Sequence, residues 1–173
     1  MTNMIVSSQM TSLLLSLLSV FIIISISFRS GWAGLLGAVP LAFTILLNYM
    51  VMGFAHINLD LITSIIASVA IGVGIDYTIH FLETFRNERA LSDDMDTVLK
   101  NTFTKTGSGI VTNALAIGLG FLVLCFSQFV VLRYIGILVA IVMFSSSMLA
   151  MTVIPGVLRL TDPKFMKKKV GKK

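Results

Sequence analysis

The chain has 173 residues, of which 56% are hydrophobic and 12% are charged. A soluble globular domain carries about 25% charged residues, so this composition excludes an ordinary soluble domain and indicates a membrane protein. The net charge of +5 does not indicate nucleic-acid binding, because the basic residues flank apolar segments or gather near the C-terminus. The single cysteine, Cys125, lies in an apolar segment and can form no disulfide within the chain.

Apolar segments long enough to cross a bilayer follow one another along the chain, and each crossing takes about 20 helical residues. They cover about residues 6–28, 35–54, 61–82, 107–126 and 132–158. The sequence therefore predicts an all-α membrane protein with five transmembrane helices. Residues 1–160 would form the transmembrane domain, and residues 161–173 a basic cytoplasmic tail.

The only sizeable polar segment separates the third and fourth apolar segments. Its apolar residues recur at helical spacing, namely Leu91, Met95, Val98, Leu99 and Phe103. Ser92 stands where an N-cap is expected. We predict an amphipathic helix over about residues 92–105, lying along the cytoplasmic surface of the membrane.

Lysine and arginine predict the orientation of the chain, because cytoplasmic loops carry an excess of both. With five crossings, one side of the membrane holds all 13 of these residues except Arg133. We therefore expect a multi-pass protein of the plasma membrane with its N-terminus outside and its C-terminus in the cytoplasm.

The third apolar segment contains an acid and a phenol side by side, Asp76 and Tyr77. A carboxylate inside a bilayer costs about 2.5–3.5 kcal/mol on insertion scales. Such a residue is therefore expected only where it pairs with another group or has a function. Gly72 and Gly74 precede the acid and allow another helix to approach closely. The alternative is an acid that only holds helices together. His80 follows one turn later on the same face, either as a proton relay or as a histidine bonded near the headgroups.

Small and polar residues fill the fourth apolar segment, among them Ser108, Thr112 and Asn113. Such residues allow close helix packing, which accounts for Ser108 better than for the other two. The chain contains no cluster of metal ligands, no nucleophile with a base and no phosphate-binding loop. We therefore expect neither an enzyme nor a metal site.

The run G-V-G-I-D-Y-T-I-H-F, from Gly72 to Phe81, resembles the G-x-x-x-D-Y signature of the resistance–nodulation–division (RND) transporter superfamily. It looks most like the MMPL type, which exports lipids and hydrophobic compounds and is related to Patched and sterol-sensing domains. Residues 96–121 and the ending I-P-G-V-L around Pro155 are similar as well. The resemblance covers essentially the whole chain, which looks like the last five spans of the second half of such a transporter.

This resemblance implies a proton-driven exporter of lipids or hydrophobic compounds, with twelve spans in two halves and large outside domains. Asp76 would carry the proton, and Tyr77 would donate to the matching carboxylate of an Asp-Tyr pair in the N-terminal half. Ser108, Thr112 and Asn113 would form a hydrogen-bond shell around Asp76. No cofactor is expected beyond the proton gradient, although sodium could replace the proton. Because this chain contains one such pair and no large outside domain, we expect a fragment or one piece of a split transporter.

Two other functions stay open at this point. One is a protein-secretion accessory subunit of the SecD or SecF kind, which also places an Asp in a similar span. The other is a non-transporting lipid-binding module of the sterol-sensing type, in which Asp76 need not titrate. Tyr77 and His80 fit the exporter pattern better than the secretion pattern. The sequence does not decide between a single copy and a homo-oligomer.

Overall fold

The computed structural model describes residues 2–57 and 61–161, and these residues form helices joined by short turns. The long helices are α1 (Thr2–Phe28), α2 (Gly31–Phe54), α3 (Leu61–Arg89), α5 (Ser108–Leu122) and α6 (Val130–Thr161). The shorter elements are α4 (Met95–Thr102), the π-helical turn η1 (Phe103–Gly107) and the 3-10 turn η2 (Val123–Phe126). No strand occurs among the described residues, so the all-α class is confirmed.

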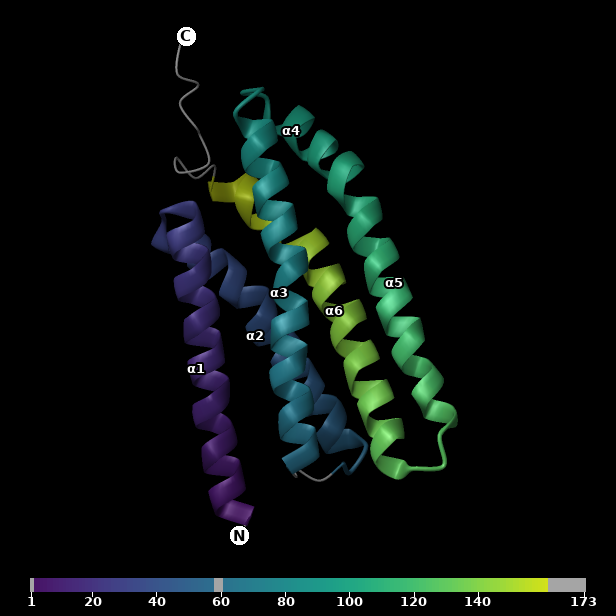
Figure 1. Ribbon diagram of the computed structural model, residues 1–173. Coiled ribbons are helices and arrows are strands. Elements are labelled where there is room, and N and C mark those ends of the chain that lie inside the picture. The colour runs from purple at the N-terminus through teal and green to yellow at the C-terminus, as the bar shows by residue number, and fades with distance from the viewer. Residues whose placement is uncertain (1, 58–60, 162–173) are drawn as a thin grey trace.

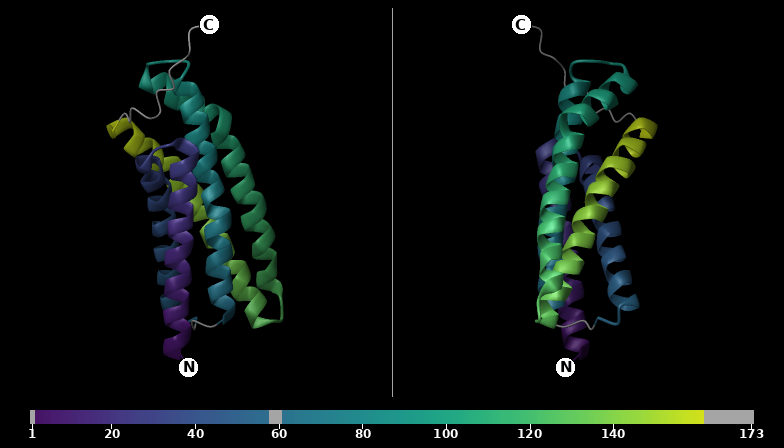
Figure 2. Two further views of the ribbon diagram at one scale, coloured as in Figure 1. Left: turned by 60° about the vertical axis from the view of Figure 1, so that its left-hand side comes forward. Right: turned by 90° about the vertical axis from the view of Figure 1, so that its right-hand side faces the viewer.

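The long helices alternate in direction and form one elongated bundle (Figure 1). α6 packs against α2, α3 and α5, while α1 packs against α2 and α3. α6 leans away from α5 toward its own C-terminal end, as the right-hand view of Figure 2 shows. The α1–α2 turn, α4 and the end of α6 lie at one end of the bundle, and the α2–α3 and α5–α6 connections lie at the other (Figure 1). We call these the α4 end and the opposite end.

Within the described residues, four stretches are long and apolar enough to cross a membrane: Met10–Phe28, Gly31–Phe54, Met95–Phe126 and Val130–Thr161. The sequence predicted five crossings, so the count is not fully matched. The helix that differs is α3, which has 29 residues and continues past its apolar part through polar turns to Arg89. It nevertheless lies inside the bundle, packed against α1, α2 and α6.

Several predicted boundaries differ from the structure. α2 starts earlier than predicted and contains Pro40, and α6 contains Pro155. The helical path runs without a break from Met95 to Phe126, because η1 joins α4 directly to α5. The surface helix predicted over about residues 92–105 and the span predicted over about residues 107–126 are therefore continuous in the structure. Residues 162–173, which hold almost all of the predicted basic tail, lie outside the described residues.

The predicted N-cap of the polar helix was wrong. α4 begins at Met95, and its cap is Asp94, whose carboxylate accepts a hydrogen bond from the backbone N–H of Thr97 at 3.1 Å. Ser92 instead accepts from the backbone N–H of Asp94 at 3.2 Å. The apolar side of α4 faces the bundle, with Val98 fully buried, while Leu91 is exposed and precedes the helix.

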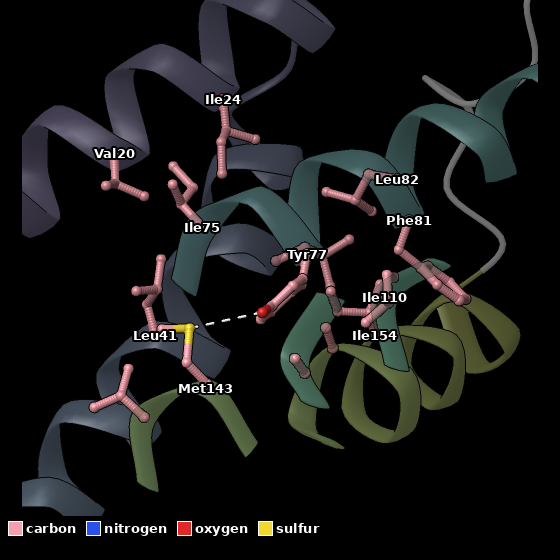
Figure 3. Packing of buried hydrophobic residues seen from close by; sticks show 14 of the residues in the cluster. Val20, Ile24, Leu41, Ile75, Tyr77, Phe81, Leu82, Ile110, Met143 and Ile154 are labelled. Carbon is pink, nitrogen blue, oxygen red and sulfur yellow. Dashed lines mark hydrogen bonds between the residues drawn. The ribbon is translucent and has the colours of Figure 1, made fainter. Parts of the chain in front are cut away.

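The core gathers around the middle of α3. Tyr77, Phe81 and Leu82 are buried there against Ile24 of α1, Leu41 of α2, Ile110 of α5, and Met143 and Ile154 of α6 (Figure 3). α5 and α6 approach closely at Gly136, where an added Cβ would lie 2.5 Å from the Phe121 carbonyl oxygen. Small residues permit such contacts, which drive helix association in a bilayer.

Candidate functional site

Asp76 lies near the middle of α3, and its side chain is exposed on the outside of the bundle. It belongs to an exposed stripe along α3 that we call the open face: Gly72, Asp76, His80, Glu83 and Asn87. These residues recur every three or four positions, the spacing at which side chains stand above one another on a helix. Within the described part of the chain, the Asp76 carboxylate forms no salt bridge.

Tyr77 points the other way, into the core. Its side chain is 1% exposed, and its hydroxyl donates to the Sδ atom of Met143 on α6 at 3.6 Å (Figure 3). Thioether sulfur is a weak acceptor, so this contact holds the hydroxyl only weakly. The acid and the phenol, adjacent in sequence, thus belong to different faces of α3.

The two glycines before the acid also occupy different faces. Gly74 is buried, and a Cβ added there would lie 3.4 Å from Ser146 Cβ on α6 and 3.5 Å from Leu41 Cδ2 on α2. Gly72 is exposed, and an added Cβ would meet no described atom within 4 Å. Gly74 thus lies at a helix contact inside the chain, whereas Gly72 leaves the open face flat beside Asp76.

An open cavity of about 380 Å³, with polar and apolar groups in its wall, lies between α3 and the η1–α5 segment. It is lined by Tyr77, His80, Thr84, Lys105, Thr106, Gly109, Ile110 and Asn113. The structure thus brings three of the predicted site residues together, Tyr77, His80 and Asn113, and the Asn113 side chain interacts with the Tyr77 phenol. His80 lies on the open face as well as on the cavity wall.

Ser108 and Thr112, the other candidates for a hydrogen-bond shell, are exposed on α5 and do not line the cavity. Asp76 does not line it either, although its neighbour Tyr77 does. The arrangement around Asp76 is therefore an exposed carboxylate beside an open cavity, not an acid enclosed by the described helices.

Polar contacts close the α4 end of the cavity. The Glu88 carboxylate is buried and accepts from Lys105 Nζ at 2.5 Å and from Asn101 Nδ2 at 3.1 Å. The hydrogen bond from Lys105 lowers the pKa of Glu88 most, burial opposes this shift, and the Asn101 amide adds to it. One turn deeper, the Thr106 hydroxyl donates to the Thr84 hydroxyl at 2.6 Å.

A protein-family model, described as the MMPL family, matches residues 1–172. The chain belongs to the MMPL family. This family is part of the RND superfamily of transporters, as the signature around Asp76 predicted. Since MMPL is a family of transporters, the chain is a member of a non-enzymatic family.

The MMPL chain is similar to a predicted membrane protein of Methanocaldococcus jannaschii, with 24% identity over 166 residues. The match covers 96% of this chain and 43% of the relative, so the chain spans less than half of the relative's length. No solved structure matches the chain.

Sequence reasoning missed four polar residues of the site: Thr84, Glu88, Lys105 and Thr106. Thr84 and Glu88 follow His80 at four-residue steps, a spacing that could have placed them on one side of the helix. Lys105 and Thr106 reach the cavity through the π-helical turn, for which the sequence has no signal. Among the described residues, no three His, Cys, Asp or Glu side chains gather at a metal-binding distance.

Proposed function

We propose that this MMPL chain is the membrane portion of a proton-driven RND-type exporter of lipids or hydrophobic compounds. The observation that carries the proposal is Asp76, an exposed carboxylate near the middle of α3, with Tyr77 beside it on the wall of an open cavity. Ionisable residues at membrane depth mark ion pathways and proton relays. Membership of a transporter family supports the same function.

Asp76 would carry the coupling proton. When protonated it is a neutral carboxyl that tolerates the bilayer, and when ionised it requires a charged or hydrogen-bonding partner. The protonated and the ionised form of Asp76 therefore favour different packing of α3 against the element that covers the open face. A proton that crosses the membrane delivers about 2.3 kcal/mol per 100 mV, which suffices to shift such an equilibrium.

The partner of the open face would be the N-terminal half of the transporter, with its own Asp-Tyr pair. The described helices bury the core face of α3 but leave Gly72, Asp76 and His80 uncovered. Glycine at position 72 would allow a second helix to reach Asp76 closely. Homo-oligomeric contact through this face is the other arrangement to test.

The α4 end would face the cytoplasm, and the N-terminus would lie outside. Basic residues of the described chain collect toward the α4 end, namely Arg29, Arg86, Arg89, Lys100, Lys105 and Arg159, whereas Arg133 follows the α5–α6 turn. A reporter fused after Lys173 should therefore be active in the cytoplasm. An active reporter outside the cell would reverse the orientation.

The test of function is export of a fluorescent phosphatidylethanolamine by cells that carry the chain with the rest of its transporter. Asp76→Asn preserves volume but cannot titrate, so export normalised to membrane protein should be lost. Tyr77→Phe should be milder, because the carboxylate remains. Full export by Asp76→Asn would end the proton-carrier role. Export that follows an imposed sodium gradient instead of a proton gradient would assign sodium as the coupling ion.

A further inference from the structure

The α5–α6 turn exposes large apolar side chains at the opposite end of the bundle (Figure 1). Phe126 is 90% exposed and Phe129 is 73% exposed. The flanking Val123 and Val130 are exposed as well. Exposed apolar patches of this kind mark surfaces that contact a membrane or another protein. The turn is therefore a candidate contact surface.

The apolar surface of the turn continues along α5. An exposed apolar stripe follows this helix at steps of three or four residues and leads into the turn: Val111, Leu115, Leu119, Val123 and Phe126. α5 belongs to the stretch Met95–Phe126, which is long and apolar enough to cross a membrane. The turn is thus continuous with the surface that a spanning helix presents to acyl chains.

Two helices place the turn at the edge of the bilayer. No charged residue occurs between Lys105 and Phe126, which are separated by about 31 Å of helix. The hydrocarbon core is about 30 Å thick, so Phe126 lies at its boundary when Lys105 lies at the other. On α6 the uncharged run extends from Arg133 to Arg159, about 39 Å, close to the about 40–45 Å of a bilayer with its headgroups. Arg133 thus lies at headgroup depth.

The polar groups of the turn suit this depth. The Ser127 N–H donates to the Leu124 carbonyl oxygen at 3.0 Å, and the Phe129 N–H donates to the Ser127 hydroxyl oxygen at 3.2 Å, so the turn supplies partners for its own backbone. The Arg133 side chain is exposed, and no acidic side chain of residues 2–57 and 61–161 forms a salt bridge with it. Its guanidinium can therefore pair with an anion from outside the described chain.

We propose that the α5–α6 turn is an interfacial anchor that binds phospholipids of the leaflet at the opposite end. Phe126 and Phe129 insert between acyl chains, as apolar side chains of interfacial segments do to a depth of about 5–10 Å. Arg133 extends its apolar stem along the turn and donates to a lipid phosphate. The anchor fixes the depth of α5 and α6 in the bilayer, and it is independent of the proton-carrier role of Asp76.

Tryptophan fluorescence measures the depth of the turn. Trp32 is the single tryptophan of the chain, so Trp32→Phe gives a background without tryptophan. In this background, Phe126→Trp and Phe129→Trp are reconstituted in phosphatidylcholine vesicles. Both should be quenched most by phosphatidylcholine brominated near the headgroup end of its acyl chains. Leu115→Trp is the control within the span and should be quenched most by bromine near the chain ends.

A second control places tryptophan in another exposed turn. Leu91 is exposed in the α3–α4 turn, which lies in the polar segment, so Leu91→Trp should be quenched by aqueous iodide and hardly by bromine. Iodide quenching of Phe126→Trp and Phe129→Trp without bromine quenching overturns the anchor, because the turn would then lie in water. Shielding of both tryptophans from both quenchers also overturns it and assigns the turn to a protein contact, such as a second copy of the chain.

Charge rescue tests the phosphate contact of Arg133. Phe126→Trp is placed in mixed vesicles of phosphatidylcholine and phosphatidylglycerol, in which one lipid at a time carries bromine. Phosphatidylglycerol should be preferred roughly fivefold, the ratio for about 1 kcal/mol per basic residue at an anionic surface. Arg133→Gln should abolish the preference, whereas Arg133→Lys should keep most of it. Circular dichroism checks that each variant retains its helices. Equal preference in Arg133→Gln and Arg133→Lys overturns the phosphate contact.

Discussion

The two faces of α3 differ in how well the other described helices cover them. On the core face Tyr77, Phe81 and Phe85 are buried by side chains of the neighbouring helices. On the open face Asp76 and His80 are exposed. The described helices therefore cover the apolar core face of α3, whereas they leave the ionisable groups of the open face uncovered. α3 thus packs into the bundle with one face and leaves ionisable groups uncovered on the other.

The largest expected effect concerns the core face. Phe81 is fully buried, and its ring meets that of Phe103 edge to face, with centroids 5.4 Å apart and planes at 70°. Phe81→Ala should lower the free energy of unfolding by about 3–5 kcal/mol, because a large cavity forms. Phe126→Ala is the control, since Phe126 is 90% exposed. Unfolding in detergent micelles measures the free energy of unfolding of both variants. Similar decreases in the two would contradict the expected difference between a core residue and an exposed one.

Gly74 and Gly72 place the same residue type on the core face and on the open face of α3. Gly74→Leu must push against Ser146 and Leu41, which should cost about 1–3 kcal/mol of unfolding free energy, as overpacking does. Gly72→Leu projects from the open face and should leave the isolated chain as stable as the parent. Its effect should be seen in export, because the proposed second helix would need the space beside Asp76. A stable Gly74→Leu protein would remove the distinction between the two faces.

The sequence predicted the helices of the bundle better than their ends. Long apolar runs decide that residues 107–126 and 132–158 are helical, because a bilayer requires internal hydrogen bonding. They do not reveal that α3 continues to Arg89 or that η1 joins α4 to α5, since both lie in the polar segment, where Glu88 of α3 pairs with Lys105 of η1. Asp76 could be recognised as a candidate site residue from its type alone. That Asp76 faces outward and Tyr77 faces the core could not be predicted, because these directions depend on where the neighbouring helices pack.

Near the α4 end, α3 carries one buried glutamate, Glu88, and one exposed glutamate, Glu83. Glu88→Gln should loosen α4 from α3 and raise hydrogen exchange of residues 95–102 severalfold, because the ion pair with Lys105 is lost. Glu83→Gln is the control, as Glu83 is exposed on the open face. The pKa of Glu88 is lowered in the folded chain. Its stabilisation is therefore present above the pKa of an unfolded glutamate and disappears as the pH falls through the lowered value.

The pH dependence of exchange in α4 separates the two carboxylates. In the parent protein, protection of residues 95–102 should fall in acid, where Glu88 takes up a proton and releases Lys105. Glu88→Gln should abolish that acid step, and Glu83→Gln should keep it. An acid step that survives in Glu88→Gln would assign it to another group, such as the capping carboxylate Asp94, whose pKa is lowered chiefly by the Thr97 hydroxyl.

The smallest effect on stability should come from Asp76, the acid that we propose as the proton carrier in export. Asp76→Asn leaves every buried contact of the core face intact, so unfolding in micelles should match the parent. Tyr77→Phe removes the O–H to sulfur contact with Met143 and should cost about 0.5 kcal/mol, at the low end for one hydrogen bond. For export the order reverses, with Asp76→Asn inactive and Tyr77→Phe partly active. A marked loss of stability in Asp76→Asn would mean that the carboxylate helps to hold the bundle together. The open face would then belong to the fold, and the proton would need another carrier.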